Sequence, residues 1–183
     1  MIPKAGKKCT MGINPKDLLE LVCIPACKQL NMLSMDALGL MMGTGAIESA
    51  LGGALIQRTA QGNIVTGGGL GWLQMQPNAH DDCWNVVIRP TIGRPGNFSK
   101  LFPYQDAPAS LMCTDLLYAA MMCRAQYSRF AEPLPAYTDS VAVYNYYKKY
   151  WNTGAGASTL EKWTAVYPPI IALLNKTDLN AYK

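Results

Sequence analysis

Histidine is nearly absent from this sequence, which has one, His80, in 183 residues. A Ser-His-Asp hydrolase needs a histidine base, and His80 has no G-x-S-x-G nucleophile turn to work with. The glycines from 67 to 71 form neither the G-x-G-x-x-G pattern nor a P-loop, and no Lys-Ser or Lys-Thr pair follows them. These absences argue against serine-hydrolase and nucleotide chemistry.

Charge is also scarce, since charged side chains make up 15% of the residues and the formal net charge is +4. The basic residues are not gathered into blocks, so we expect no nucleic-acid partner, and an acidic polymer or envelope surface is slightly favoured. The apolar run LLELVCIPAC after the basic N-terminal residues is broken by Glu20 and Pro25. It lacks the form of a secretory signal, so we expect a product made and kept in a cytoplasm.

Length and composition predict one domain over residues 1–183, because half of the residues are apolar and the chain suits a single core. The six cysteines lie mostly among apolar neighbours on predicted helices, which favours free buried thiols over disulfides. Neither the Cys23 and Cys27 pair nor the His80 and Cys83 pair makes a convincing zinc site. We therefore expect no metal and no cofactor.

Helix signals dominate the chain and predict a mainly α fold of the α+β class. Asn14 followed by Pro15 begins one helix, and Ser34 caps another that runs towards Glu48. Helical patterns also cover 77–88, 109–130, 138–151 and 158–167. The pattern weakens from Leu51 to Gln76, where glycines suggest a small hairpin or tongue beside Glu48.

Glu48 is the only charged residue between Ala37 and Ile56. Desolvation disfavours a carboxylate, and so does the negative end of a helix dipole, so both effects predict a raised pKa for Glu48. A carboxyl group that keeps its proton in this way is suited to general acid catalysis. The alternative is a solvated carboxylate at a frayed helix end.

Three motifs in order give the chain a resemblance to the lysozyme-like lytic transglycosylases, which include goose-type lysozymes and bacteriophage lysozyme-like proteins. Glu48-Ser49 at a helix end looks like the catalytic Glu-Ser of the family. Gly71-Trp72-Leu73-Gln74-Met75 is similar to its Gly-Leu-Met-Gln segment, although Trp72 interrupts the usual tetrapeptide. Val143-Tyr144-Asn145 looks like its Ala-Tyr-Asn motif. The match covers about residues 34–151.

The resemblance implies a lysozyme-like fold and cleavage of the β-1,4 bond between N-acetylmuramic acid and N-acetylglucosamine in peptidoglycan, with Glu48 as general acid and base. It implies substrate-binding roles for Ser49, Thr66, Trp72, Gln74, Met75, Tyr144 and Asn145. The segment GWLQMQPNAHDDCW also looks like one in phage proteins. Such an endolysin would act at the cell wall or periplasm after holin-dependent release from the host cytoplasm, or would arrive within a virion.

A second carboxylate is the point that the sequence leaves open. The choices are Asp81, Asp82, Asp106 and Asp139, and none is compelling as a nucleophile or water activator. A lytic transglycosylase needs none, because the muramic acid's own hydroxyl attacks to give a 1,6-anhydro product. We therefore favour a transglycosylase over a hydrolase.

Two other classes of function stay open beside the enzyme. One is a catalytically inactive lysozyme-fold protein that binds the wall or serves in a virion, since Trp72, Gln74, Met75 and Tyr144 could equally be packing residues. The other is a membrane-active protein inserting through residues 37–56. Five glycines and Glu48 within that stretch argue against stable insertion.

Overall fold

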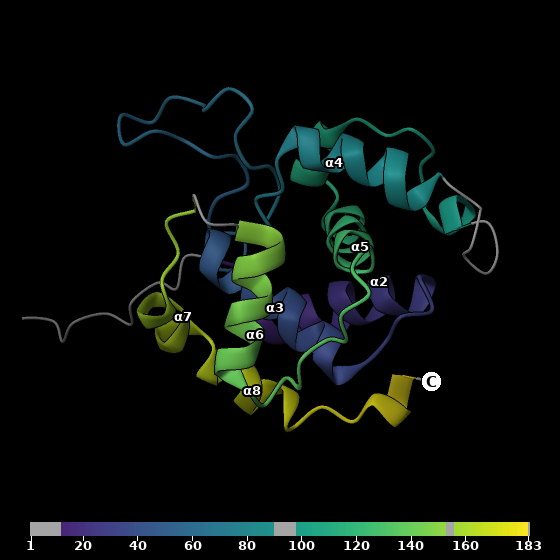
Figure 1. The fold of residues 1–183 in the computed structure, drawn as a ribbon, viewed down its shortest axis with the longest axis vertical. Coiled ribbons are helices and arrows are strands. Elements are labelled where there is room, and N and C mark those ends of the chain that lie inside the picture. Colours follow the sequence, from purple (N-terminus) through teal and green to yellow (C-terminus); the bar gives the residue numbers. More distant parts are fainter. Residues whose placement is uncertain (1–11, 90–97, 153–155, 183) are drawn as a thin grey trace, which may run out of the picture.

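The computed structural model describes residues 12–89, 98–152 and 156–182, and within these ranges the fold is helical (Figure 1). This confirms the prediction of a mainly α protein. The α-helices are α1 (Pro15–Leu18), α2 (Ile24–Gln29), α3 (Met35–Ser49), α4 (Pro77–Cys83), α5 (Leu116–Tyr127), α6 (Ser140–Tyr147), α7 (Leu160–Val166) and α8 (Pro168–Leu174). The 3₁₀-helices are η3 (Phe98–Leu101), η4 (Ala109–Cys113) and η6 (Leu179–Tyr182).

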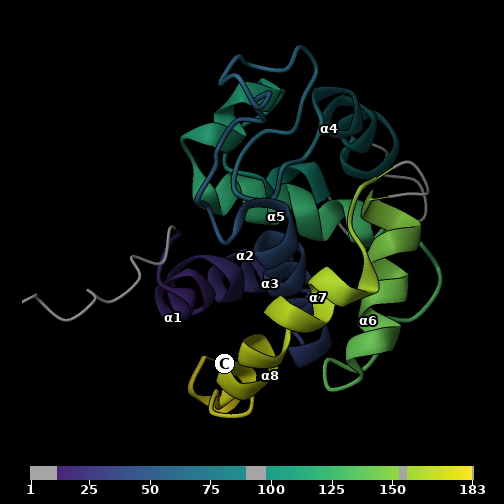
Figure 2. The same cartoon turned by 90° about the vertical axis from the view of Figure 1, so that its left-hand side faces the viewer.

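Helix α3 lies at the centre of the molecule, with α2 and α5 packed against it as well as α6, α7 and α8 (Figure 2). Ser34 caps it as predicted, because the Ser34 hydroxyl accepts a hydrogen bond from the Ala37 amide at 3.1 Å. Every residue from Ala37 to Gly45 is buried, which makes α3 a core helix. No helix in the described part of the chain is long and apolar enough to cross a membrane.

Glycines in α3 let large aromatic rings approach its backbone. A Cβ added at Gly43 would collide with the ring of Trp163, and one added at Gly45 would collide with the ring of Trp72. Both tryptophan side chains are fully buried. The two glycines therefore bring α7 and the loop that carries Trp72 close to the helix that carries Glu48.

Within the described ranges, three helices contain π-helical turns, which the sequence patterns do not reveal. The first helix runs from Pro15 to Gln29 through the turn η1 (Leu19–Cys23), just before Pro25. Proline has no amide hydrogen to donate, so a widened turn there accommodates the missing bond. The other two turns are η2 (Trp84–Ile88) after α4 and η5 (Lys148–Asn152) after α6. The last of these shapes the candidate site described below.

The helix predicted over 109–130 is in fact two helices, because Asp115 starts a new one. Its carboxylate accepts a hydrogen bond from the Tyr118 amide at 2.8 Å, so η4 ends and α5 begins around it. Helix α7 also begins later than the predicted range 158–167. Thr159 caps it by accepting the bond from the Lys162 amide at 3.3 Å, so the helix starts at Leu160.

The segment from Leu51 to Gln76 forms an irregular tongue beside the end of α3. Single antiparallel bridges join Ile56 to Leu70, Arg58 to Ile64 and Leu70 to Met75, and no regular β-strand forms in the described ranges. The predicted hairpin is therefore not confirmed. Glycines concentrated from Gly67 to Gly71 explain the outcome, because they weaken strand pairing and favour turns.

The described cysteines are free thiols, as the sequence predicts for them. The Cys23 Sγ lies 3.6 Å from the Met42 Sδ, and the Cys27 Sγ lies 3.5 Å from the Met41 Sδ. The two thiols therefore pack within the apolar core. Burial raises the pKa of both thiols. These cysteines are packing residues, and Cys9 lies outside the described residues.

Candidate functional site

Glu48 is the penultimate residue of α3, as the helix pattern predicts. The helix stops because Ala50 adopts a left-handed conformation, with φ of 52°, and its amide bonds to the carbonyls of Ala46 and Gly45. Leu51 also has a positive φ, of 58°. Two such residues in succession turn the chain sharply away, so the Glu48 side chain stands at the edge of the core.

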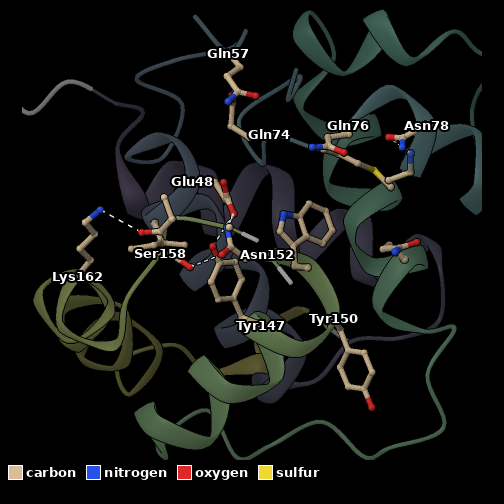
Figure 3. A pocket seen from close by; sticks show the side chains of 17 residues that line it. Glu48, Gln57, Gln74, Gln76, Asn78, Tyr147, Tyr150, Asn152, Ser158 and Lys162 are labelled. Atoms are coloured by element: carbon tan, nitrogen blue, oxygen red, sulfur yellow. Dashed lines mark hydrogen bonds between the residues drawn. The ribbon is translucent and has the colours of Figure 1, made fainter. Parts of the chain in front are cut away.

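A groove of about 740 Å³ opens over Glu48 (Figure 3). The tongue and the start of α4 supply one wall, while α6, η5 and α7 supply the other. The lining residues are Ile47, Glu48, Gln57, Gln74, Met75, Gln76, Asn78, Ala79, Gln126, Tyr147, Tyr150, Trp151, Asn152, Gly156, Ala157, Ser158 and Lys162. Among them Glu48 is the sole acid, and uncharged amides are the commonest polar groups.

The Glu48 carboxyl group receives two hydrogen bonds on the same oxygen. Tyr147 donates its hydroxyl to Oε1 at 2.6 Å, and Asn152 donates its amide to Oε1 at 3.3 Å. Within the described part of the chain, no hydrogen bond involves Oε2. Because Oε1 already serves as an acceptor, a proton on this carboxyl group is best placed on Oε2.

Burial raises the pKa of Glu48, as the sequence predicts. The hydrogen bonds from Tyr147 and Asn152 and the positive charge of Lys148 oppose this effect, because each stabilises the carboxylate. Burial, together with the charge of Glu48, also raises the pKa of Tyr147, so the phenol stays protonated as a donor. The site thus holds a proton on Glu48 to higher pH than an exposed glutamate does.

The Asn152 side chain is fixed by donors on its far side. Lys148 donates its ammonium to Oδ1 at 2.7 Å, and Ser158 donates its hydroxyl to the same oxygen at 2.7 Å. Lys148 also donates to the Gly156 carbonyl at 2.7 Å. These contacts connect η5 with the segment that leads into α7.

Two of the residues implied by the family resemblance line the groove beside Glu48. Gln74 has a left-handed backbone, with φ of 53°, and its amide nitrogen donates to the carbonyls of Gly71 at 2.8 Å and Ala54 at 3.1 Å. Met75 is buried, with 3% of its surface exposed. Gln74 therefore has its nitrogen engaged in holding the tongue, and its carbonyl oxygen is the atom left for a ligand.

Ser49 and Trp72 do not line the groove, and they pack beneath it. The Ser49 hydroxyl donates to the Trp72 carbonyl and accepts from the Gly52 amide at 2.8 Å. The Trp72 indole donates to the Leu116 carbonyl at 3.3 Å, and its ring is fully buried against Gly45. Both residues thus position the tongue against α3.

Thr66, Tyr144 and Asn145 also lie away from the groove. Thr66 is exposed on the tongue. Tyr144 donates its hydroxyl to the Ser158 carbonyl at 3.3 Å and packs its ring against Trp163. Asn145 is exposed and lines a different hollow of about 240 Å³. The structure does not bring these three side chains to Glu48.

The residues that do contact Glu48 were missed by the sequence patterns. Tyr147 comes three residues after Tyr144, so it shares a helix face with the motif residue, and this spacing is the one signal that points to it. Asn152 comes five residues after Tyr147, which on a regular α-helix is about 140° away. The π-helical turn η5 widens the helix and lets both side chains reach Glu48.

The four aspartates considered as second carboxylates all lie outside the groove lining. Asp81 contacts His80 at 2.8 Å, Asp82 pairs with Arg129 at 2.7 Å and Asp106 pairs with Arg89 at 2.6 Å. Asp139 caps α6 by accepting from the Ala142 amide at 3.0 Å. Each has a partner that explains its position.

No group of three or more His, Cys, Asp or Glu side chains in the described ranges is arranged to hold a metal ion. Among the described lining residues, the polar groups are amides, hydroxyls, the Trp151 indole, one carboxyl group and one lysine. No protein-family model matches this chain, and neither does any curated protein or solved structure.

Proposed function

We propose that this protein cleaves the glycan strands of peptidoglycan, with Glu48 as general acid and base. The observation that carries the proposal is the Glu48 carboxyl group itself. Burial raises its pKa, two donors occupy Oε1, and Oε2 is left for a proton at a groove. A general acid requires a carboxyl group that remains protonated near the working pH and faces its substrate.

The lining of the groove suits an amide-bearing sugar polymer. Gln57, Gln76, Asn78 and Gln126 present uncharged donors and acceptors, which match the hydroxyl and acetamido groups of N-acetylated sugars. Tyr150 and Trp151 add aromatic side chains to the lining from the opposite wall. A volume of about 740 Å³ is within the usual size of ligand sites.

Within this proposal a lytic transglycosylase is favoured over a hydrolase. Glu48 passes its Oε2 proton to the glycosidic oxygen, and the bond from that oxygen to the anomeric carbon of muramic acid breaks. The 6-hydroxyl of the muramic acid then attacks the anomeric carbon and returns its proton to Glu48. The step gives a 1,6-anhydro product and consumes no water, so the one carboxyl group among the described lining residues is sufficient.

The lysozyme-like fold belongs to the same proposal. A central helix that ends in an acid, a tongue beside it and a groove between the tongue and the later helices support this fold. An enzyme of this kind would act on the wall as a phage endolysin released by a holin, or as a virion component. The peptidoglycan strand is its proposed partner.

Mass spectrometry of soluble fragments tests the proposal. Purified peptidoglycan is incubated with the native protein, with Glu48→Gln and with Glu20→Gln as a matched control. Glu20 undergoes the same change of charge but lies on η1 and does not line the groove. We expect anhydro-muropeptides from the native protein and the control, and none from Glu48→Gln.

Two other outcomes would change the conclusion. Reducing-end muropeptides would identify a hydrolase, which needs a water activator other than the four aspartates outside the groove. Wall binding without fragments from any variant would reject catalysis and leave a wall-binding or virion structural protein.

A further inference from the structure

The orientation of the Asn152 amide is determined by its neighbours. Oδ1 accepts from the Lys148 ammonium and the Ser158 hydroxyl, each at 2.7 Å. An ammonium has only donors, so turning the amide over would place its NH₂ group against a donor and its oxygen against Oε1 of Glu48. The amide nitrogen must therefore face Glu48.

Gly156 restricts the same side chain from another direction. A Cβ added at Gly156 would collide with the Asn152 carboxamide, so a glycine is needed for that amide to lie where it does. Lys148 bonds both to Asn152 and to the Gly156 carbonyl, and thus holds the two residues together. The Asn152 amide is fixed by packing as well as by hydrogen bonds.

We propose that Lys148 is a positioning residue, whose ammonium holds the Asn152 amide in the one orientation that donates to Glu48 and so keeps the acid's proton on the oxygen left for the groove. Lys148 is not among the described groove-lining residues, so its proposed role is to position Asn152 and not to bind substrate. This role deepens the proposed function, since it explains how a proton is kept on Oε2.

Other charged or titratable groups also lie near Glu48, and the test must distinguish the effect of Lys148 from theirs. Tyr147 donates to Glu48 from α6, Tyr127 lies near it from α5, and Lys162 lines the groove from α7. The described lining residues of the tongue carry no charge, since they are the amides Gln57, Gln74 and Gln76 and the thioether Met75. Lys148 also lowers the pKa of Glu48 directly through its charge, so a loss of charge and a loss of positioning must be told apart.

A double-mutant cycle separates the two effects. Lys148→Met removes both the charge and the donor with little change of length, and Asn152→Leu removes the amide that the lysine is proposed to hold. The titration of the Glu48 carboxyl carbon is followed by ¹³C NMR in the native protein, both single variants and the double variant. Lys149→Met is the control, because Lys149 pairs with Glu132 at 2.6 Å and does not touch Asn152.

We expect Lys148→Met to raise the Glu48 midpoint by roughly one pH unit, because the carboxylate loses a cation and a fixed donor. In the Asn152→Leu background, the same substitution should shift the midpoint by less than half as much, since only the direct charge effect remains. Equal shifts in both backgrounds would overturn the proposal. Should Asn152→Leu fail to fold by circular dichroism, Asn152→Ala supplies the same background.

The titration needs no substrate, so it stands apart from the test of the proposed function. If native protein releases no glycan fragments but the shifts differ between backgrounds, the function fails and the positioning role stands. If fragments appear but the shifts are equal, the positioning role fails alone. In an active enzyme, the alkaline limb of the pH-rate profile should follow the NMR midpoint in each variant.

Discussion

Replacing Tyr147 by phenylalanine tests the assignment of Glu48 most directly. The substitution removes one oxygen atom, which donates to Oε1 of Glu48 at 2.6 Å. The ring is fully buried and stacks on Trp163, so its packing stays in place. The variant therefore removes the hydrogen bond to the acid and a side-chain hydrogen bond with Ser158, and it keeps the ring packing.

The size of the effect follows from the energy of a hydrogen bond to a charged group, about 1.5–3 kcal/mol. The bond stabilises the carboxylate more than the neutral acid, so its loss favours the protonated form. One pKa unit corresponds to about 1.4 kcal/mol, which makes the expected increase in the pKa of Glu48 about one to two units. The direction is upward, in addition to the increase that burial already causes.

The assay is the pH dependence of kcat/KM for fragment release from peptidoglycan. A general acid must be protonated, so the rate falls above its pKa, and Tyr147→Phe should move this alkaline limb to higher pH by about one to two units. Tyr150→Phe is the matched control, because Tyr150 lines the same groove but donates to Glu132 at 2.6 Å. An unmoved limb, or one that moves to lower pH, would refute the assignment of Glu48 as the acid.

Two further predictions concern stability. Burial raises the folded-state pKa of Glu48, so the protonated side chain contributes to the stability of the fold. This contribution is fully present below the unfolded-state pKa and is lost as the pH rises through the folded-state pKa. Glu48→Gln mimics the protonated acid, so it should raise the Tm above that of the native protein at pH 8 and leave the Tm unchanged at pH 4. Thermal scans at the two pH values measure this, and an equal increase in Tm at both would contradict the prediction. Ala50→Gly should stabilise the fold by about 0.5–1 kcal/mol in urea titrations, since glycine accepts φ of 52° without the cost that alanine bears, although it loses more entropy on folding. A loss of stability would show that the turn after α3 is not strained.

Local signals in the sequence were enough to place Glu48. Ser34 has the side chain of a helix cap, and the apolar residues that follow it predict a helix that ends near Glu48. The lone charge in an apolar stretch predicts the raised pKa, because burial of α3 is visible in composition alone. These inferences needed only residues close together in the chain.

The partners of Glu48 could not be predicted because they depend on contacts across the fold. The pattern of regular helices gives no sign of the π-helical turn η5, which brings Asn152 onto the face of Tyr147. Trp72 looked like a sugar-binding residue beside a glycine-rich loop, but Gly45 in α3 leaves the space that buries it. Gly45, which is distant from Trp72 in the sequence, therefore makes Trp72 a buried packing residue.

The hydrogen bond between Tyr147 and Glu48 joins residues 99 positions apart. A chain in which α3 has formed but α6 has not yet docked would carry an ordinary, solvated glutamate at this position. Under the proposed function, Glu48 thus becomes a competent acid only when α6 is in place. Incompletely folded molecules, and molecules whose α6 has opened locally, should therefore release no glycan fragments, although they retain every residue of the site.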